Sequence, residues 1–418
     1  MVVLALMAPV AFARQRAVAH PFTPPPDPAV WVRANAIPLA TTEPLAPLDD
    51  LAPMQSLIGD AHVVGLGDGT HGTHEYFQTK VRMIRYLVEQ MNFTGVALEA
   101  PFADFGQLNT YILGGSGDPR RILLTHRELN YWFWACEELV QLIEWMRQYN
   151  MTRGARSAVE IVGIDVYDPD GAAAIAISYL QRVDPSAASA ASTTYSRCVV
   201  RMTVPGSTCP SELAAVANNI TAHPEWIATT GATDYYDAQH AAHLVDVYQA
   251  TFNGRPSFAE RDQRMAEYVS FAIDHHTSNG RLALWMHQEH AGRTTKNIQG
   301  SRSTGSWLGE RYGNDYFVFG NATGNGTYLG ADLTKGANVT TTYALPSAKS
   351  DSFESIFEAA GIPRMIVPLR GSVPDSLRAS HPYRFGTSAQ PYEIEEPMTP
   401  KFDAVVWIES TTPTITFW

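Results

Sequence analysis

The chain has 418 residues, of which 45% are hydrophobic and 17% are charged, and its net charge is −12 at pH 7. This composition supplies a large core and excludes a mainly disordered protein, and no run reaches the roughly 18 consecutive apolar residues of a membrane span. The negative charge argues against nucleic acid as a partner, because binding it usually requires a basic face.

The N-terminal residues have the pattern of an export signal. Residues 2–13 form an apolar run that ends in an A-x-A-like sequence, although the usual positive charge before it is missing. We therefore predict a signal peptide over residues 1–20 and a secreted or cell-envelope protein, with the cytoplasm as the alternative. Residues 21–52 contain Pro24-Pro25-Pro26 and are interpreted as an N-terminal arm.

Three cysteines are too few for a disulfide scaffold or a Cys-rich zinc site. Cys136 lies in an apolar helical run, so we expect it to be buried. Cys198 and Cys209 flank a Pro/Gly loop and would close a short disulfide in an exported protein.

From about residue 60, short apolar runs alternate with longer helical patterns. The runs are rich in Val, Ile and Leu without strict polar alternation, which is typical of strands buried on both faces of a parallel sheet. They are residues 62–67, 95–100, 160–165, 281–286, 316–320, 364–369 and 403–409. An amphipathic helical pattern, YFQTKVRMIRYLVEQM, lies between the first two, so these elements form a βαβ unit.

Residues 172–260 interrupt the alternation with Ala/Ser-rich helical sequence. We predict an α/β fold with a mainly parallel central sheet flanked by helices, and with a helical insertion that caps the cleft at the C-terminal ends of the strands. The length allows two lobes or one large domain with an insertion. This pattern favours the second, with a core made of residues 53–171 and 261–418.

Polar side chains follow four of the predicted strands directly. Asp68 and His71 follow the first strand, Glu99 ends the second, Asp165 ends the third, and the run 287–290, His-Gln-Glu-His, follows the fourth. In open α/β sheets, ligands bind beyond the carboxyl ends of the strands. We therefore predict that these side chains meet in one site centred on His71.

Each candidate also has a purely structural alternative. His71 would otherwise be an exposed loop residue beside a helix N-cap, and Glu99 would cap a loop or form a salt bridge. One histidine of the 287–290 run would be buried and hydrogen-bonded and the other exposed. Trp132 and Trp134 wall an apolar substrate pocket or else belong to the core.

The sequence lacks the motifs of a covalent nucleophile. No G-x-S-x-G nucleophile elbow occurs, and none of the three cysteines has a strand–turn–helix setting. The remaining chemistry is direct attack by water, activated by a histidine with a carboxylate or by a metal ion.

The segment GLGDGTHGTHEYFQTKVRMIRYLVEQMNFTGVALEA resembles the opening motif of the erythromycin esterase family, which has G-E-x-T-H-G and a closing I-E-A. Four further stretches resemble the family in order: LIEWMRQYN, RDQRMAEYV, LWMHQEH and FDAVVWIESTTP. The resemblance spans roughly residues 30–415. It implies an α/β scaffold with helical additions over the cleft, and ester hydrolysis without a serine nucleophile; the best-known members open macrolide lactones.

The resemblance also implies roles for individual residues. His71 corresponds to the proposed general base that activates water, and Glu99 to the carboxylate that orients the base or the water. His287 and His290 correspond to a pair that polarises the carbonyl or binds the oxyanion. Arg261 corresponds to the arginine of the R-D-x-x-M-A-E segment.

The chain departs from the family pattern at three places. Asp68 replaces the usual glutamate, Glu289 adds a carboxylate to the A-H-N-G-H strand end, and Tyr268 stands where asparagine is common. We count Asp68 among the catalytic candidates. The substrate-binding candidates are Arg261, His74, Trp132, Trp134 and Lys80, which occupies a position where members often carry a basic residue.

We therefore predict a hydrolase that cleaves an ester or lactone by direct attack of water activated by His71, with no covalent intermediate, cofactor or metal. In one alternative Asp68, His71, Glu99, His287 and His290 are ligands of Zn²⁺ or Mn²⁺. In another, the protein is a non-catalytic binding module. The expected partner is a small-molecule ester or lactone such as a macrolide, with neither nucleic acid nor membrane, and the oligomeric state stays open.

Overall fold

The computed structural model describes residues 27–128, 131–199, 210–252, 257–296, 300–332, 334–336, 339–386 and 391–418. The predicted signal peptide and Cys209 lie outside these residues. Cys136 is buried and free, and Cys198 is disulfide-bonded. No helix within the described ranges has the length and apolar character that crossing a bilayer requires.

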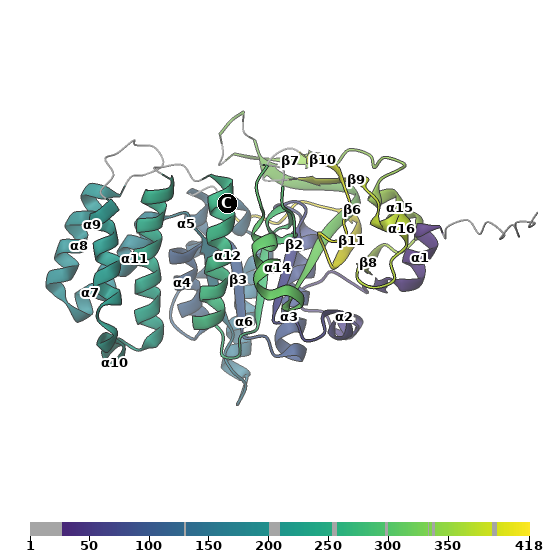
Figure 1. The fold of residues 1–418 in the computed structure, drawn as a ribbon. Coiled ribbons are helices and arrows are strands. Elements are labelled where there is room, and N and C mark those ends of the chain that lie inside the picture. Colours follow the sequence, from purple (N-terminus) through teal and green to yellow (C-terminus); the bar gives the residue numbers. More distant parts are fainter. Residues whose placement is uncertain are drawn as a thin grey trace, which may run out of the picture.

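The described chain builds a nine-stranded sheet at the centre of the molecule (Figure 1). The strand order is β1-β8-β11-β6-β2-β5-β3-β4, and β7 pairs with the far end of β6. The six strands from β11 to β4 pair in parallel, while β1, β7 and β8 pair in antiparallel fashion. The bounds are β1 Ile37–Pro38, β2 Val63–Asp68, β3 Gly95–Pro101, β4 Glu160–Asp165, β5 Leu282–His287, β6 Tyr316–Ala331, β7 Thr340–Ala344, β8 Arg364–Pro368 and β11 Ala404–Thr411.

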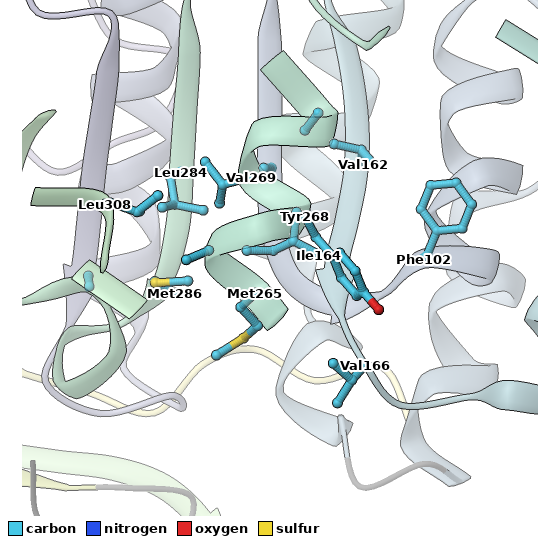
Figure 2. Close-up of a cluster of buried hydrophobic side chains, with 14 of the residues drawn as sticks. Phe102, Val162, Ile164, Val166, Met265, Tyr268, Val269, Leu284, Met286 and Leu308 are labelled. Carbon is cyan, nitrogen blue, oxygen red and sulfur yellow. The ribbon is translucent and has the colours of Figure 1, made fainter. Parts of the chain in front are cut away.

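The predicted α/β fold with a mainly parallel sheet flanked by helices is confirmed, and each apolar run forms a strand. All residues of β2, β3 and β5 are buried, because helices cover both faces of the sheet. One face packs against α3 (His74–Met91) and α6 (Glu137–Thr152), and the other against α12 (Phe258–His275) and α14 (Thr304–Tyr312). Figure 2 shows the core on the face that α12 and α14 cover, where Val269 of α12 lies beside Leu284 of β5.

The residues of the predicted insertion fold as helices. Their bounds are α7 Pro169–Val183, α8 Pro185–Cys198, α9 Pro210–Thr221, α10 Ile227–Thr230 and α11 Ala232–Phe252. Buried alanines on α7 and α11 let these helices pack closely. Figure 1 shows the bundle at the left, beside α12, whereas we expected a cap above the strand ends. His276 joins it to the core, because its two ring nitrogens each lie 3.0 Å from a carboxylate, on Glu160 of β4 and Asp237 of α11.

The remaining elements are short and lie mainly at the ends of the sheet. A hairpin of β9 and β10 pairs outside the main sheet. The bounds are α1 Pro28–Asn35, α2 Met54–Ile58, α4 Phe102–Ile112, α5 Pro119–Glu128, α13 Gln288–Ala291, α15 Phe353–Ala359, α16 Asp375–Arg378, β9 His381–Gly386 and β10 Pro391–Glu396, with 3-10 turns at Asp49–Leu51, Trp132–Trp134, Pro224–Trp226 and Gly313–Asp315.

Candidate active site

The candidate site lies at the carboxyl ends of β2, β5, β3 and β4, which are neighbours in the sheet. The parallel register places Asp68 beside His287. Because parallel strands end at the same edge, residues more than 200 positions apart in the chain meet there. The sequence places a carboxylate or a histidine at the end of each of these four strands.

His71 faces Asp68 across the loop that follows β2. Its Nδ1 lies 2.9 Å from Asp68 Oδ2, although the angle between the groups falls outside that of a regular hydrogen bond. The imidazole stacks flat on Phe133, with ring centres 4.1 Å apart and planes 7° apart. His287 approaches it at 4.9 Å with its ring tilted by 55°. The His71 side chain is 9% exposed, so only a small part of the ring reaches solvent.

Asp68 is buried and is held by two further donors. Lys80 Nζ of α3 donates to its Oδ1, and so does Trp285 Nε1 at 3.2 Å. Burial alone would raise the pKa of Asp68, but the charges of Lys80 and His71 outweigh burial and lower it. Burial lowers the pKa of Lys80 to about 8. The prediction that Lys80 binds substrate is therefore not supported by its position, since its ammonium group is buried against Asp68.

Glu99 forms the second centre of the site, on the opposite face of the sheet. Its Oε1 accepts a hydrogen bond from Arg261 Nη2 at 2.6 Å, and its Oε2 accepts the backbone N–H of His287 at 2.8 Å. Burial would raise the pKa of Glu99, but the neighbouring His290 and Arg261 hold it well below its usual range. Arg261 also binds Asp165 through Nε at 3.0 Å, so one guanidinium joins the ends of β3 and β4.

His290 is held at both ring nitrogens. Its Nδ1 lies 2.7 Å from Asp262 Oδ1, and its Nε2 lies 2.9 Å from Arg261 Nη1. Burial lowers the pKa of His290, but the charges of Asp262 and Glu99 outweigh burial and raise it. A guanidinium can only donate, so Nε2 accepts and Nδ1 donates to Asp262. Neither nitrogen is then available to a substrate in this arrangement.

His287 has a different tautomer. Its Nδ1 accepts the backbone N–H of Glu289 at 3.2 Å, at the start of α13. A neutral ring with an acceptor at Nδ1 carries its proton on Nε2. His287 therefore carries its proton on Nε2, whereas His290 carries it on Nδ1.

Three predicted substrate-binding residues lie outside this cluster. His74 Nδ1 pairs with Glu138 Oε1, whose oxygen also accepts Ile415 N of the C-terminal tail. Trp132 and Trp134 are buried in the core and do not line an open pocket. Trp134 Nε1 instead donates to the backbone oxygen of Glu99 at 3.1 Å.

The sequence analysis missed two residues of the cluster. Phe133 lies between two tryptophans in an apolar run, so nothing in the sequence indicates which of the three rings meets His71. Asp262 directly follows Arg261 in the sequence, and this position alone could have identified it as a residue of the cluster. The added carboxylate of Glu289 is buried against Lys401 Nζ, at 2.5 Å, so it does not change the charge that a substrate would meet.

The carboxylates of the site are already paired with cations. Within the described ranges, no group of three or more His, Cys, Asp or Glu side chains is arranged to hold a metal ion. Lys80 on Asp68 and Arg261 on Glu99 occupy the positions from which these carboxylates would bind a divalent cation.

Two surface hollows in the described part of the chain lie away from this cluster. One, of about 420 Å³, lies between α12 and α14, and the other, of about 440 Å³, lies between α4, α7 and α11. Neither is lined by His71, Glu99 or His287. Perturbed carboxylates and histidines gather at the strand ends, so we place the candidate site there.

Fold and site together define an α/β protein with a histidine–carboxylate centre at the strand ends. Residues 88–411 match the sequence model of the erythromycin esterase family, so the chain belongs to this family. This membership indicates a hydrolase.

Two relatives support the family assignment to different extents. Erythromycin esterase type II of Escherichia coli is 30% identical over 137 residues, which is 32% of this chain and 31% of that protein. The chain thus spans less than a third of that protein's length. "Putative hydrolase YbfO" of Bacillus subtilis (strain 168) is 23% identical over 422 residues, covering 92% of this chain and 91% of that protein.

Solved structures share the fold. A Bacillus cereus protein has a TM-score of 0.80 at 23% identity, covering 93% of this chain and 98% of that chain. A succinoglycan biosynthesis protein has a TM-score of 0.76 at 22% identity, covering 92% and 97%. A histidine-to-asparagine mutant of the erythromycin esterase EreC, in its open conformation, has a TM-score of 0.64 at 16% identity, covering 88% and 96%.

Proposed function

We propose that the protein hydrolyses an ester or lactone, with a macrolide lactone as the first substrate class to test, by direct attack of a water molecule that His71 activates. The observation that carries the proposal is the position of the Asp68 carboxylate, whose Oδ2 lies 2.9 Å from His71 Nδ1 and whose Oδ1 accepts from Lys80. Family membership supports a hydrolase, and the macrolide class comes from the family and relative names.

The carboxylate of Asp68 favours the tautomer of His71 that carries its proton on Nδ1. The lone pair is then on Nε2. In the reaction, Nε2 takes a proton from water while the water oxygen forms a bond to the substrate carbonyl carbon. When the tetrahedral intermediate collapses, the same proton passes to the leaving alkoxide. Such general-base help contributes roughly 10²–10⁴ in rate.

We assign stabilisation of the oxyanion to His287, the role that the family resemblance implies for it. Its Nε2–H donor belongs to a ring that lies 4.9 Å from the ring of His71, and its backbone N–H is fixed on Glu99. A single preorganised oxyanion donor contributes about 10²–10³ in rate. His290 and Arg261 position Glu99 and the end of β4, because their polar atoms are engaged with Glu99, Asp165 and Asp262.

The test is mass spectrometry of reaction mixtures that contain 14-membered macrolides, smaller lactones and simple alkyl esters, each with wild-type protein and His71→Asn. Hydrolysis adds one water to a lactone and is expected with wild type alone. Stabilisation of the wild type by a macrolide without any product would instead favour a binding module. Equal turnover by His71→Asn would refute the role of His71.

A further inference from the structure

Phe133 stacks on the ring of the proposed base. The centres of the Phe133 and His71 rings are 4.1 Å apart and their planes are almost parallel, and Phe133 is buried. Parallel aromatic rings at this spacing are in van der Waals contact. The imidazole therefore has one face closed by a phenyl group.

The turn that carries Phe133 is fixed at both ends. The hydroxyl of Tyr131 donates to Asp165 Oδ2 at 2.5 Å, and the indole of Trp134 donates to the backbone oxygen of Glu99 at 3.1 Å. Just beyond the turn, Cys136 pairs with Thr416 of the C-terminal tail. The ring of Phe133 is thus tied to the ends of β3 and β4, which carry the acidic residues of the site.

We propose that Phe133 is a positioning residue for His71, which fixes the plane of the imidazole and stabilises the imidazolium that forms when the ring accepts a proton from water. This inference rests on the proposed function. A phenyl face is electrostatically negative, and a desolvated cation over it is stabilised more than a neutral ring is. A partial rotation of the imidazole about its Cβ–Cγ bond would break the stack, so the stack fixes the plane of the ring, and Asp68 determines that Nδ1 occupies the edge that faces it.

Asp68 selects the ring edge that carries Nδ1, whereas Phe133 fixes the plane of the ring. Asp68 attracts the imidazolium from β2, and Glu99 does so from β3. Lys80 offsets the charge of Asp68, and Arg261 offsets that of Glu99, while His287 faces His71 from the end of β5. When the ring is protonated, the Phe133 face adds to the attraction of Asp68, whose Oδ2 lies 2.9 Å from His71 Nδ1.

The test compares Phe133→Leu, which keeps an apolar side chain without a π face, with Phe133→Tyr, which keeps the aromatic face. The ring of His71 is followed by NMR in histidine-labelled protein from pH 4 to 9. Its signal is assigned as the one that is missing from the spectrum of His71→Asn. The control is Phe93→Leu. Phe93 is also buried in the same core, but it precedes β3 and so lies at the N-terminal ends of the strands, away from the site. Macrolide hydrolysis is measured with the same proteins.

In Phe133→Leu, the His71 titration midpoint is expected to fall by about 0.4–1.5 pH units, and kcat by about two- to thirty-fold, with a smaller change in KM. Phe133→Tyr and Phe93→Leu are expected to keep the wild-type midpoint. If Phe133→Leu is folded and titrates like wild type, Phe133 only fills space and the inference is wrong. If Phe133→Leu is unfolded, Phe133→Met is used for the same comparison.

Failure of the proposed function gives a different pattern. An active His71→Asn variant refutes the role of His71 as general base, regardless of the result with the Phe133 variants. An inactive His71→Asn variant together with an unchanged titration in Phe133→Leu refutes the role of Phe133 alone.

Discussion

Replacement of Arg261 by methionine tests whether the cluster depends on this buried cation. The guanidinium binds Glu99, Asp165 and His290, which come from β3, β4 and α13. Methionine fills a similar volume but leaves the buried carboxylates without their partner. Removing one partner of a buried ion pair destabilises a protein by about 3–5 kcal/mol.

This free energy converts to a change in melting temperature. With an unfolding entropy of about 2.1 cal/mol/K per residue, the 418 residues give about 0.9 kcal/mol/K, so Tm falls by about 3–6 °C. The control is Arg264→Met on the same helix, whose side chain is 29% exposed and pairs with Glu267. An exposed pair contributes at most about 1 kcal/mol, which corresponds to about 1 °C.

The assay is thermal unfolding at pH 7 and at pH 3.5. The pKa of Glu99 is depressed in the folded state, so its stabilisation is present above the unfolded value of about 4.3 and is lost as the pH falls. The difference between Arg261→Met and wild type should therefore narrow at pH 3.5. Equal melting of Arg261→Met and Arg264→Met at pH 7 would refute the reasoning.

Three further predictions follow from the same contacts. Asp68→Asn should lower kcat roughly 10²–10⁴-fold with a smaller change in KM, because His71 loses the carboxylate that orients it; steady-state rates within threefold of wild type would contradict this. Burial lowers the pKa of His276, but Asp237 and Glu160 outweigh burial and raise it to about 9. The charged His276 therefore stabilises the folded protein fully below about pH 6.5, and this stabilisation is lost as the pH rises through 9. Urea unfolding should show a loss of about 3 kcal/mol over this range that His276→Gln lacks. Dialysis against EDTA should leave turnover unchanged, and recovery of activity only with added Zn²⁺ or Mn²⁺ would favour the metal alternative.

The sheet was predictable because buried parallel strands are continuous apolar runs. Strand direction was not predictable, because an apolar run has the same composition in either direction. For example, β8 is antiparallel to β11 although its sequence resembles those of the neighbouring strands. The extension of β6 to Ala331 was missed, since NATGNGTYLGA is rich in small and polar residues and is ordered by pairing with β7 and β11.

The residues at the strand ends were predictable because parallel topology brings them together. The position of His74 was not predictable from the sequence, because α3 begins at that residue and its side chain pairs with Glu138. The stack of Phe133 on His71 depends on a 3-10 turn between two buried tryptophans, and hydrophobic periodicity carries no information on which ring faces the loop. Tertiary packing decides both cases.

The most direct measurement of the central claim is the rate of lactone hydrolysis by His71→Asn beside His62→Asn, on whichever substrate the wild type cleaves. His62 is exposed and precedes β2, at the opposite end of the strand that leads to His71. If His71 activates the attacking water, His71→Asn loses at least about 10²-fold in kcat with an unchanged Tm, and His62→Asn keeps the wild-type rate. A folded His71→Asn protein that turns over at the rate of His62→Asn would contradict the account.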